Sequence, residues 1–126
     1  MAPATLKKRA DFLRLRGGAR CATPSFVLET RPRPSEDREI TGPRFGYTVT
    51  KKIGGAVERN RIKRRLRAVV GLVTSEKARS DHDYVLIARG PALVCPFSDL
   101  KKDLERALQR VHQAVVPSAK GPRAKG

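Results

Sequence analysis

The spacing of apolar and polar residues predicts three strands. Residues 22–30 (ATPSFVLET) and residues 44–50 (RFGYTVT) alternate between the two kinds of residue, which is typical of strands with one buried face. Residues 84–88 (YVLIA) form a short, continuous apolar run, which is typical of a strand that is buried on both faces. A further short strand is possible at residues 39–42, and the 22–30 segment can also divide into two strands.

Alternation within the first two strands separates a core face from an outer face. In the first strand, Phe26 and Leu28 share one face, and Val27 and Glu29 share the other. The second strand gathers its large side chains on one face, which carries Phe45, Tyr47 and Val49. We expect the faces with the largest apolar side chains to form the core.

Apolar residues spaced three or four apart predict three helices. The first spans about residues 8–16 and ends at the glycine pair 17–18. The central helix spans about residues 56–73. The last helix follows the N-cap candidate Ser98 and spans about residues 99–115. Its apolar side chains recur at helical spacing, and they are Leu100, Leu104, Ala107, Leu108 and Val111.

The connecting segments indicate one folded domain with flexible ends. Proline and charge mark residues 31–43 (RPRPSEDREITGP) as an exposed connection, and residues 74–83 (TSEKARSDHD) form a polar break. We expect a flexible basic arm at residues 1–6, a single domain at residues 7–116 and a disordered basic tail at residues 117–126. The order α-β-β-(β)-α-β-α predicts an α+β sandwich around a small central sheet.

The charge of the chain favours a polyanionic partner. There are 28 Lys and Arg residues against 12 Asp and Glu residues, which gives a formal net charge of +16. A domain with this imbalance repels itself unless a polyanion neutralises it, and nucleic acid is the usual partner. An anionic membrane is the alternative, but a membrane-surface helix needs exposed Trp or Phe, and the sequence has no Trp. Because the sequence lacks both an apolar run of about 20 residues and a signal peptide, we expect a cytoplasmic protein with no membrane partner.

The central helix separates basic from apolar side chains. In a helical projection, several of the basic residues share one stripe of the helix surface with a polar residue and a glycine. This stripe consists of Asn60, Lys63, Arg64, Arg67 and Gly71. The opposite side is apolar and consists of Ile62, Leu66, Val69 and Val73. Arg59 lies on one flank, and Arg61 and Arg65 lie on the other. One side of the helix therefore suits a core, and the other suits a polyanion.

A solvated charged face is the alternative reading of this helix. It predicts mixed signs, with acidic and basic residues four apart. Instead, six of the nine residues 59–67 are Arg or Lys, and Glu58 is the only acid nearby. Arginine binds phosphate through two hydrogen bonds and stacks on bases, and Asn60 suits a ribose hydroxyl or a base edge. Gly54 and Gly55 would let phosphate approach open amide groups at the start of the helix.

The segment KKIGGAVERNRIKRRLR, residues 51–67, resembles the signature of the protein subunit of bacterial ribonuclease P. That signature runs as a Lys-rich turn, Gly, Ala-Val and then Arg-Asn-x-x-Lys-Arg-x-x-Arg. The surrounding segments are similar in the same order: DF in the first helix, FVL in the first strand, GYTVTKK before the motif, DYVLIAR after it and a final amphipathic helix. The resemblance covers about residues 6–113.

In this family, the catalyst is a large RNA that uses bound Mg²⁺ to cut the 5′ leader from precursor tRNA. The resemblance implies an accessory protein subunit, a monomer in a 1:1 complex, whose partners are the catalytic RNA and precursor tRNA. It also implies a left-handed crossover from the 44–50 strand through the central helix to a parallel 84–88 strand. The residues that it implies as RNA contacts are Lys51, Lys52, Arg59, Asn60, Arg61, Lys63, Arg64 and Arg67.

The family also holds the single-stranded leader in a cleft between the sheet and the first helix. The resemblance implies Phe12 and Arg16 as leader-binding residues of this chain, and strand alternation adds Val27 and Glu29, which face away from the core. Stacking of a base on an aromatic ring contributes about 1–3 kcal/mol, although Phe12 can equally anchor its helix to the core. Arg16 and Glu29 stand where relatives often carry aromatic residues, which leaves fewer stacking platforms here.

No catalytic or metal-binding residue is predicted in the chain itself. A protein ribonuclease needs a general acid and base, or a metal held by carboxylates. His82 and His112 show no paired arrangement, and the acids beside His82 are expected in a polar loop. We therefore expect Mg²⁺ to be held mainly by the RNA. A ribosomal protein or RNA chaperone and a DNA-binding protein are the rival classes, but the motif argues against the first, and the second lacks a helix-turn-helix pair.

Overall fold

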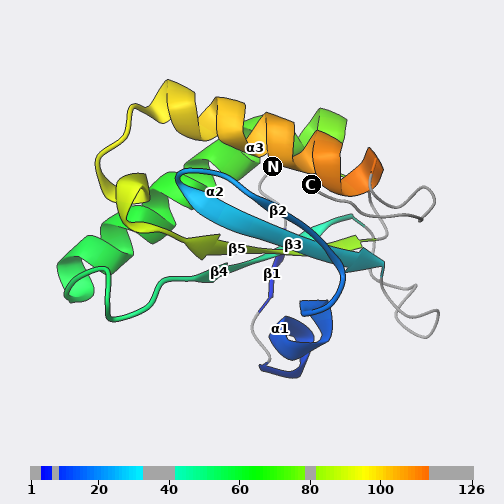
Figure 1. Cartoon of the computed structure of the whole chain (residues 1–126), viewed down its shortest axis with the longest axis horizontal. Helices are drawn as coiled ribbons and strands as arrows, with labels where there is room; N and C mark the ends of the chain where they lie inside the picture. The colour runs from blue at the N-terminus through cyan, green and yellow to red at the C-terminus, as the bar shows by residue number, and fades with distance from the viewer. Residues whose placement is uncertain (1–3, 7–8, 33–41, 79–81, 114–126) are drawn as a thin grey trace.

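The computed structural model describes residues 4–6, 9–32, 42–78 and 82–113 (Figure 1). Among these residues, no helix is long and apolar enough to cross a bilayer. The elements follow one another as β1 (Ala4–Thr5), α1 (Arg9–Leu15), β2 (Ala19–Ala22), β3 (Phe26–Pro32), β4 (Arg44–Thr48), α2 (Ala56–Lys77), β5 (His82–Ala88), the short 3₁₀ helix η2 (Gly90–Leu93) and α3 (Phe97–Gln113).

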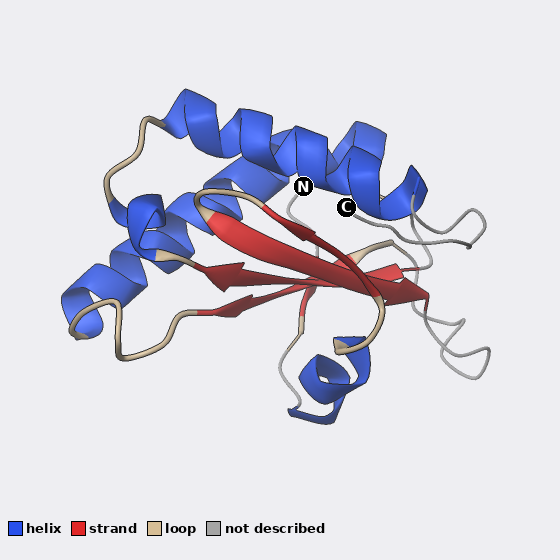
Figure 2. Cartoon of the chain, viewed as in Figure 1, coloured by secondary structure: helices blue, strands red, loops and turns tan. Residues whose placement is uncertain are grey.

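The strands form one mixed sheet in the order β1-β4-β5-β3-β2. β4 and β5 are parallel neighbours joined through α2, whereas β3 pairs antiparallel with both β5 and β2. Figure 2 shows α2 and α3 over one face of the sheet and α1 on the other. The predicted α+β fold, with a parallel β-α-β unit around the central helix, is confirmed.

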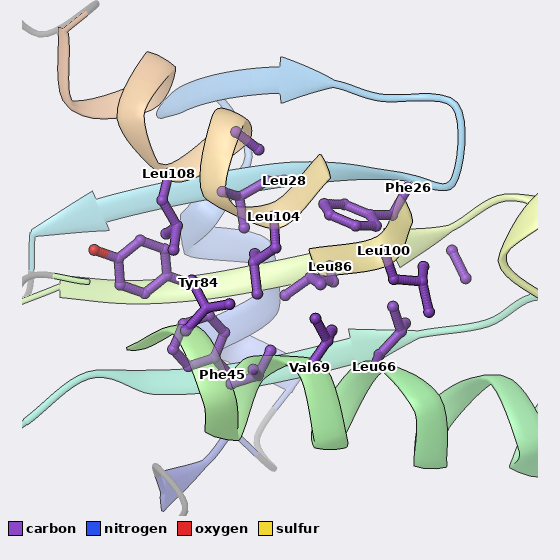
Figure 3. Close-up of a cluster of buried hydrophobic side chains, with 14 of the residues drawn as sticks. Phe26, Leu28, Phe45, Leu66, Val69, Tyr84, Leu86, Leu100, Leu104 and Leu108 are labelled. Carbon is purple, nitrogen blue, oxygen red and sulfur yellow. The ribbon is translucent and has the colours of Figure 1, made fainter. Parts of the chain in front are cut away.

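Alternation along the strands sends every second side chain toward α2 and α3. Tyr84 of β5 stacks on Phe45 of β4 in this layer, with ring centroids 4.7 Å apart. From α2, Leu66 and Val69 pack fully buried in the same core (Figure 3). The predicted apolar row of α3 completes it, with Leu100, Leu104, Ala107, Leu108 and Val111 all buried. The prediction that one side of α2 is apolar and faces the core is therefore confirmed.

The other side chains of the sheet face α1. Val85 of β5 forms a smaller apolar cluster there with Leu6 and Leu15. Leu6 is only 3% exposed, and its backbone amide donates a hydrogen bond to the carbonyl of Phe45 at 2.8 Å. The predicted flexible arm at residues 1–6 is therefore wrong for residues 4–6, because they extend the sheet and bury a leucine under α1.

Several predicted boundaries differ from the observed ones. The 22–30 segment holds only β3, which begins at Phe26 and continues into the predicted connection at 31–43, whereas its hairpin partner β2 lies before the segment and shares only Ala22 with it. The polar residues 74–77 continue α2 instead of ending it. α3 begins one residue before Ser98, which is therefore not its N-cap. The predicted tail at 117–126 lies outside the described residues, as does the possible strand at 39–42 apart from Gly42.

The predicted polar loop before the last strand is partly wrong. His82 and Asp83 belong to β5 and are 6% and 0% exposed. Both polar side chains are buried with partners, since Asp83 pairs with arginines and the His82 ring lies 5.0 Å from the His112 ring, edge to face. Burial of polar groups with such partners does not appear in a hydropathy pattern.

Candidate nucleic-acid interface

The start of α2 is capped by its own side chain. The backbone amide of Gly55 donates a hydrogen bond to Oε1 of Glu58 at 2.9 Å. This satisfies one of the amide groups that the start of a helix leaves open. The prediction of an open Gly55 amide for phosphate is therefore wrong. Glu58, the one acid near the basic residues, is engaged with the backbone.

A continuous basic surface covers the outer side of α2 and the turn before it. It forms because α2 turns Ile62, Leu66 and Val69 into the core, which leaves the opposite stripe outside. We call this surface the basic face, and its members are Lys51, Lys52, Asn60, Arg61, Lys63, Arg64 and Arg67. All of them are exposed except Lys63, which is half-buried.

In the part of the chain that the structure describes, carboxylates do not neutralise the basic face. Among the described residues, the ion pairs join Arg14, Arg20 and Arg44 to acids of the sheet and of α1, and none involves α2. Like charges four apart on a helix, such as Lys63 and Arg67, are destabilising while they remain unpaired. The face is therefore suited to a partner that supplies negative charge.

Two other arginines of α2 turn partly inward. Arg65 donates hydrogen bonds to the backbone carbonyls of Leu93, at 3.3 Å, and of Cys95. It ties α2 to the last residue of η2 and to the segment between η2 and α3, a structural role that the helical projection does not show. Arg59, a predicted RNA contact, is half-buried with its Nε enclosed, so it is less open than Arg61.

Tyr47 of β4 supports one member of the basic face. The guanidinium carbon of Arg67 lies 5.6 Å from the centroid of the Tyr47 ring, which is a cation–π arrangement. Burial raises the pKa of Tyr47 to about 12, so its hydroxyl stays protonated at neutral pH. The sequence pattern placed Tyr47 with the core side chains and gave no sign of this contact, which restricts the orientation of Arg67.

A cleft of about 490 Å³ lies between α1 and the sheet. It brings together three of the four predicted leader-binding residues, Phe12, Arg16 and Glu29. Val27 is half-buried beside Ile87 on the neighbouring strand and does not line the cleft. The lining residues that were not predicted are Arg9, Leu13, Thr48, Thr50, Val85 and Ile87. Strand alternation was the available signal for Thr48 and Thr50, because it placed both away from the core.

The cleft and the basic face meet at the end of β4. Thr48 and Thr50 line the cleft, and Lys51 and Lys52 follow directly in the chain. Consecutive Cα atoms are only about 3.8 Å apart. An extended, strand-like ligand that lies in the cleft and continues past Thr50 therefore comes within reach of the basic face.

Phe12 lines the cleft and also anchors α1. Its ring lies against Gly46 of β4, where an added Cβ would sit 2.5 Å from two ring atoms. The ring is half-buried and packs beside Leu6, Leu15 and Val85. Both interpretations of Phe12, packing and cleft lining, therefore describe the same side chain.

We expect Gly46→Ala to destabilise the protein by about 1–3 kcal/mol, because the new methyl group must displace Phe12 and with it α1. Urea unfolding measures the change in free energy. Gly71→Ala in α2 is the matched control, since an added Cβ there meets nothing within 4 Å and alanine favours a helix. Equal stability of the Gly46→Ala and parent proteins would show that α1 is not seated on β4.

A buried carboxylate also holds α1 on the sheet. Asp83 of β5 is fully buried and accepts a hydrogen bond from Arg14 of α1 at 2.5 Å. Arg44 of β4 donates two more, at 2.9 and 2.6 Å. Arg14 also donates to the carbonyl of Pro32 at the end of β3, at 3.0 Å. This Asp83 network joins α1 to three strands and so positions the wall of the cleft that carries Phe12.

The two histidines meet in the structure, although the sequence showed no pairing. His82 packs edge-on against His112, and Nε2 of His112 lies 2.6 Å from the hydroxyl of Tyr84. Tyr84 belongs to the core under α2 and α3, so this group does not lie in the cleft. Within the described parts of the chain, no three His, Cys, Asp or Glu side chains gather in a group that could hold a metal ion.

A mixed sheet with an un-neutralised basic helix on one face and a lined cleft on the other defines a small α+β protein of the nucleic-acid-binding class. The model of the ribonuclease P family matches residues 2–112. The chain therefore belongs to the ribonuclease P protein family, as the motif around α2 implied.

Individual relatives agree with this assignment. A ribonuclease P protein component of Erythrobacter litoralis is 42% identical over 111 residues, which cover 88% of each chain. The component of Paramagnetospirillum magneticum is 41% identical over 126 residues, covering 94% of this chain and 95% of the relative. Among solved structures, the Staphylococcus aureus RNase P protein is 34% identical and covers 83% of this chain and 92% of its own, with a TM-score of 0.67. The RNase P protein of Thermotoga maritima is 25% identical, covers 84% of this chain and 96% of its own, and has a TM-score of 0.70.

Proposed function

We propose that this chain is the protein subunit of ribonuclease P, which binds the catalytic RNA through the basic face and the 5′ leader of precursor tRNA in the cleft. It assists the endonucleolytic removal of the leader that gives the mature 5′ end of tRNA, and the cleavage itself resides in the RNA. The observation that carries the proposal is the junction of the two surfaces. A basic face that no carboxylate of the described residues neutralises continues, at Thr50 and Lys51, into a cleft whose lining is aromatic, apolar and basic apart from two threonines and Glu29.

The chemistry of each surface suits its proposed ligand. Arginines of the basic face can bind phosphates through two hydrogen bonds, and Asn60 can bind a ribose hydroxyl of a structured RNA. Single-stranded nucleic acid is bound by stacking platforms together with positive charge along the backbone. The cleft offers the Phe12 ring as a platform and Arg9 and Arg16 as charges.

Mg²⁺ is the cofactor that we assign to the complex, where it would activate the attacking water and stabilise the leaving oxygen. The described residues of this chain do not fit a site for it, because no group of three acidic or other ligating side chains forms among them. The basic face would also repel a divalent cation. We therefore propose that the ion is held mainly by the RNA.

We also propose one copy of this protein per catalytic RNA, in the cytoplasm. A net charge of +16 opposes self-association of the free protein. The relatives with similar sequences are bacterial, and bacterial tRNA is made and processed in the cytoplasm.

Reconstitution tests the proposed function directly. Purified protein, the cognate catalytic RNA and a precursor tRNA are mixed at low Mg²⁺, and the release of the leader is followed on a gel. We expect cleavage only when both protein and catalytic RNA are present, because the basic face compensates for the repulsion between RNA phosphates. Cleavage by the protein alone, or no assistance to the RNA, would contradict the proposal and favour a structural RNA-binding protein.

Phe12→Leu should weaken binding of precursor tRNA about fivefold and leave binding of mature tRNA unchanged, because leucine retains the packing of Phe12 but not its stacking surface. Equilibrium binding of the two tRNAs to the reconstituted complex measures the ratio. Phe97→Leu is the matched control, since Phe97 lies at the start of α3 and outside the cleft. Equal losses for precursor and mature tRNA would assign Phe12 to packing alone.

A further inference from the structure

Glu29 is an acid in a cleft that we propose to bind a polyanion. It lies in β3, directly opposite Arg20 of β2 and Val85 of β5 in the strand register, and it is only 5% exposed. The other side chains of the cleft are apolar, hydroxylic or basic. A carboxylate in this position repels phosphate, so the sugar-phosphate backbone of a bound strand should not be the part that faces Glu29.

Arg20 holds this carboxylate in place. Its Nη1 donates a hydrogen bond to Oε2 of Glu29 at 3.2 Å, while most of the Arg20 side chain remains exposed. Among the described residues, no hydrogen bond reaches the second oxygen, Oε1. An ionised carboxylate can only accept hydrogen bonds, and each oxygen has two acceptor positions. Glu29 therefore presents a fixed acceptor at the wall of the cleft.

The surroundings of Glu29 suit a base. Val85 and Ile87 of the neighbouring strand and Phe12 of α1 line the same cleft and provide apolar and aromatic surface for its ring. The Watson–Crick edges of unstacked bases are the groups that proteins read in single-stranded RNA. Adenine, cytosine and guanine carry an exocyclic amino group that can donate to a carboxylate, and uracil has none.

We propose that Glu29 determines specificity in the leader by accepting a hydrogen bond from the exocyclic amino group of one leader base. Guanine is the base that fits best, because its amino group lies next to a ring N–H, and these two donors can pair with the two carboxylate oxygens, of which Oε2 keeps one acceptor position beside Arg20. Uracil fits least. This inference rests on the proposed function, since it requires the leader to lie in the cleft.

The test compares precursor tRNAs that differ at one leader nucleotide. Each leader position in turn carries guanine, adenine, cytosine or uracil, and kcat/KM of the reconstituted enzyme is measured by competition. We expect one position at which guanine exceeds uracil by about fivefold to tenfold, in line with one or two base-edge hydrogen bonds. Glu29→Gln should remove most of this preference, whereas Glu105→Gln on α3 should keep it.

A substrate change avoids any effect of the substitution on folding. Inosine in place of the preferred guanine lacks only the exocyclic amino group, so it should lower kcat/KM for the parent enzyme and have no effect with Glu29→Gln. Absence of a base preference at every position, or a guanine-to-inosine effect that survives Glu29→Gln, would overturn the inference. Both results leave the proposed function intact if precursor tRNA still binds more tightly than mature tRNA, whereas loss of that difference in the parent enzyme would contradict the proposed function itself.

Discussion

Replacing Arg64 and Arg67 together by alanine is expected to weaken binding of the catalytic RNA about 100-fold. Both side chains are exposed on the basic face, and no carboxylate among the described residues pairs with them. Two lost arginine–phosphate contacts, at about 1.5 kcal/mol each, give an effect of this size. The decline of log K with log salt concentration should also become shallower, by about 1.4–1.8 slope units. Each phosphate contact releases counterions when it forms, and the variant forms two fewer contacts. Filter binding or fluorescence titration over a range of salt concentrations measures both quantities.

A charge-matched variant separates this effect from general electrostatics. Lys102 and Arg106 are exposed on α3, and their joint replacement by alanine removes the same two charges. We expect the α3 variant to lose much less affinity than the α2 variant. Arg65 is unsuitable as a control because it bonds to the carbonyls of Leu93 and Cys95. Equal losses from both helices would mean that RNA responds to net charge and that the basic face is not a defined site.

Asp83→Asn should lower the free energy of unfolding by about 3 kcal/mol or more, since removal of one partner from a buried ion pair leaves the other charge uncompensated. Asp83 is fully buried between Arg14 and Arg44, and asparagine keeps its shape but not its charge. Urea unfolding measures the loss, with Glu105→Gln on α3 as a variant expected to stay within about 0.5 kcal/mol of the parent. A loss below about 1 kcal/mol for Asp83→Asn would show that the network does not hold α1 on the sheet.

The elements of the fold were largely predictable because their periodicities are strong. Alternation in β3 and β4 correctly separated the core side chains Phe26, Leu28 and Phe45 from the side chains that face α1. Helical spacing likewise predicted which side of α2 is buried. Boundaries were less predictable: neither the early strand before α1 nor the strand character of His82 and Asp83 was expected, because both depend on pairing with distant strands.

The basic face was predictable for the same reason as the core. Its members lie within one helix and the turn before it, so their common orientation follows from helix geometry. The cleft was only partly predictable, since its lining comes from α1, β3, β4, β5 and the segments just after α1 and β4. The resemblance to the family supplied Phe12 and Arg16, and strand alternation supplied Glu29 but also Val27, which does not line the cleft.

The order of charged and apolar residues was sufficient to establish a basic helix, an α+β arrangement and a polyanionic partner, because each of these follows from local periodicity and total charge. Partners that are remote in the chain required the folded structure. Arg14 and Arg44 meet Asp83 across 69 and 39 residues, and the Arg67 guanidinium stacks on Tyr47 from another element. Such contacts depend on how the helices pack on the sheet, and no pattern within a single segment shows which residues of distant segments will meet.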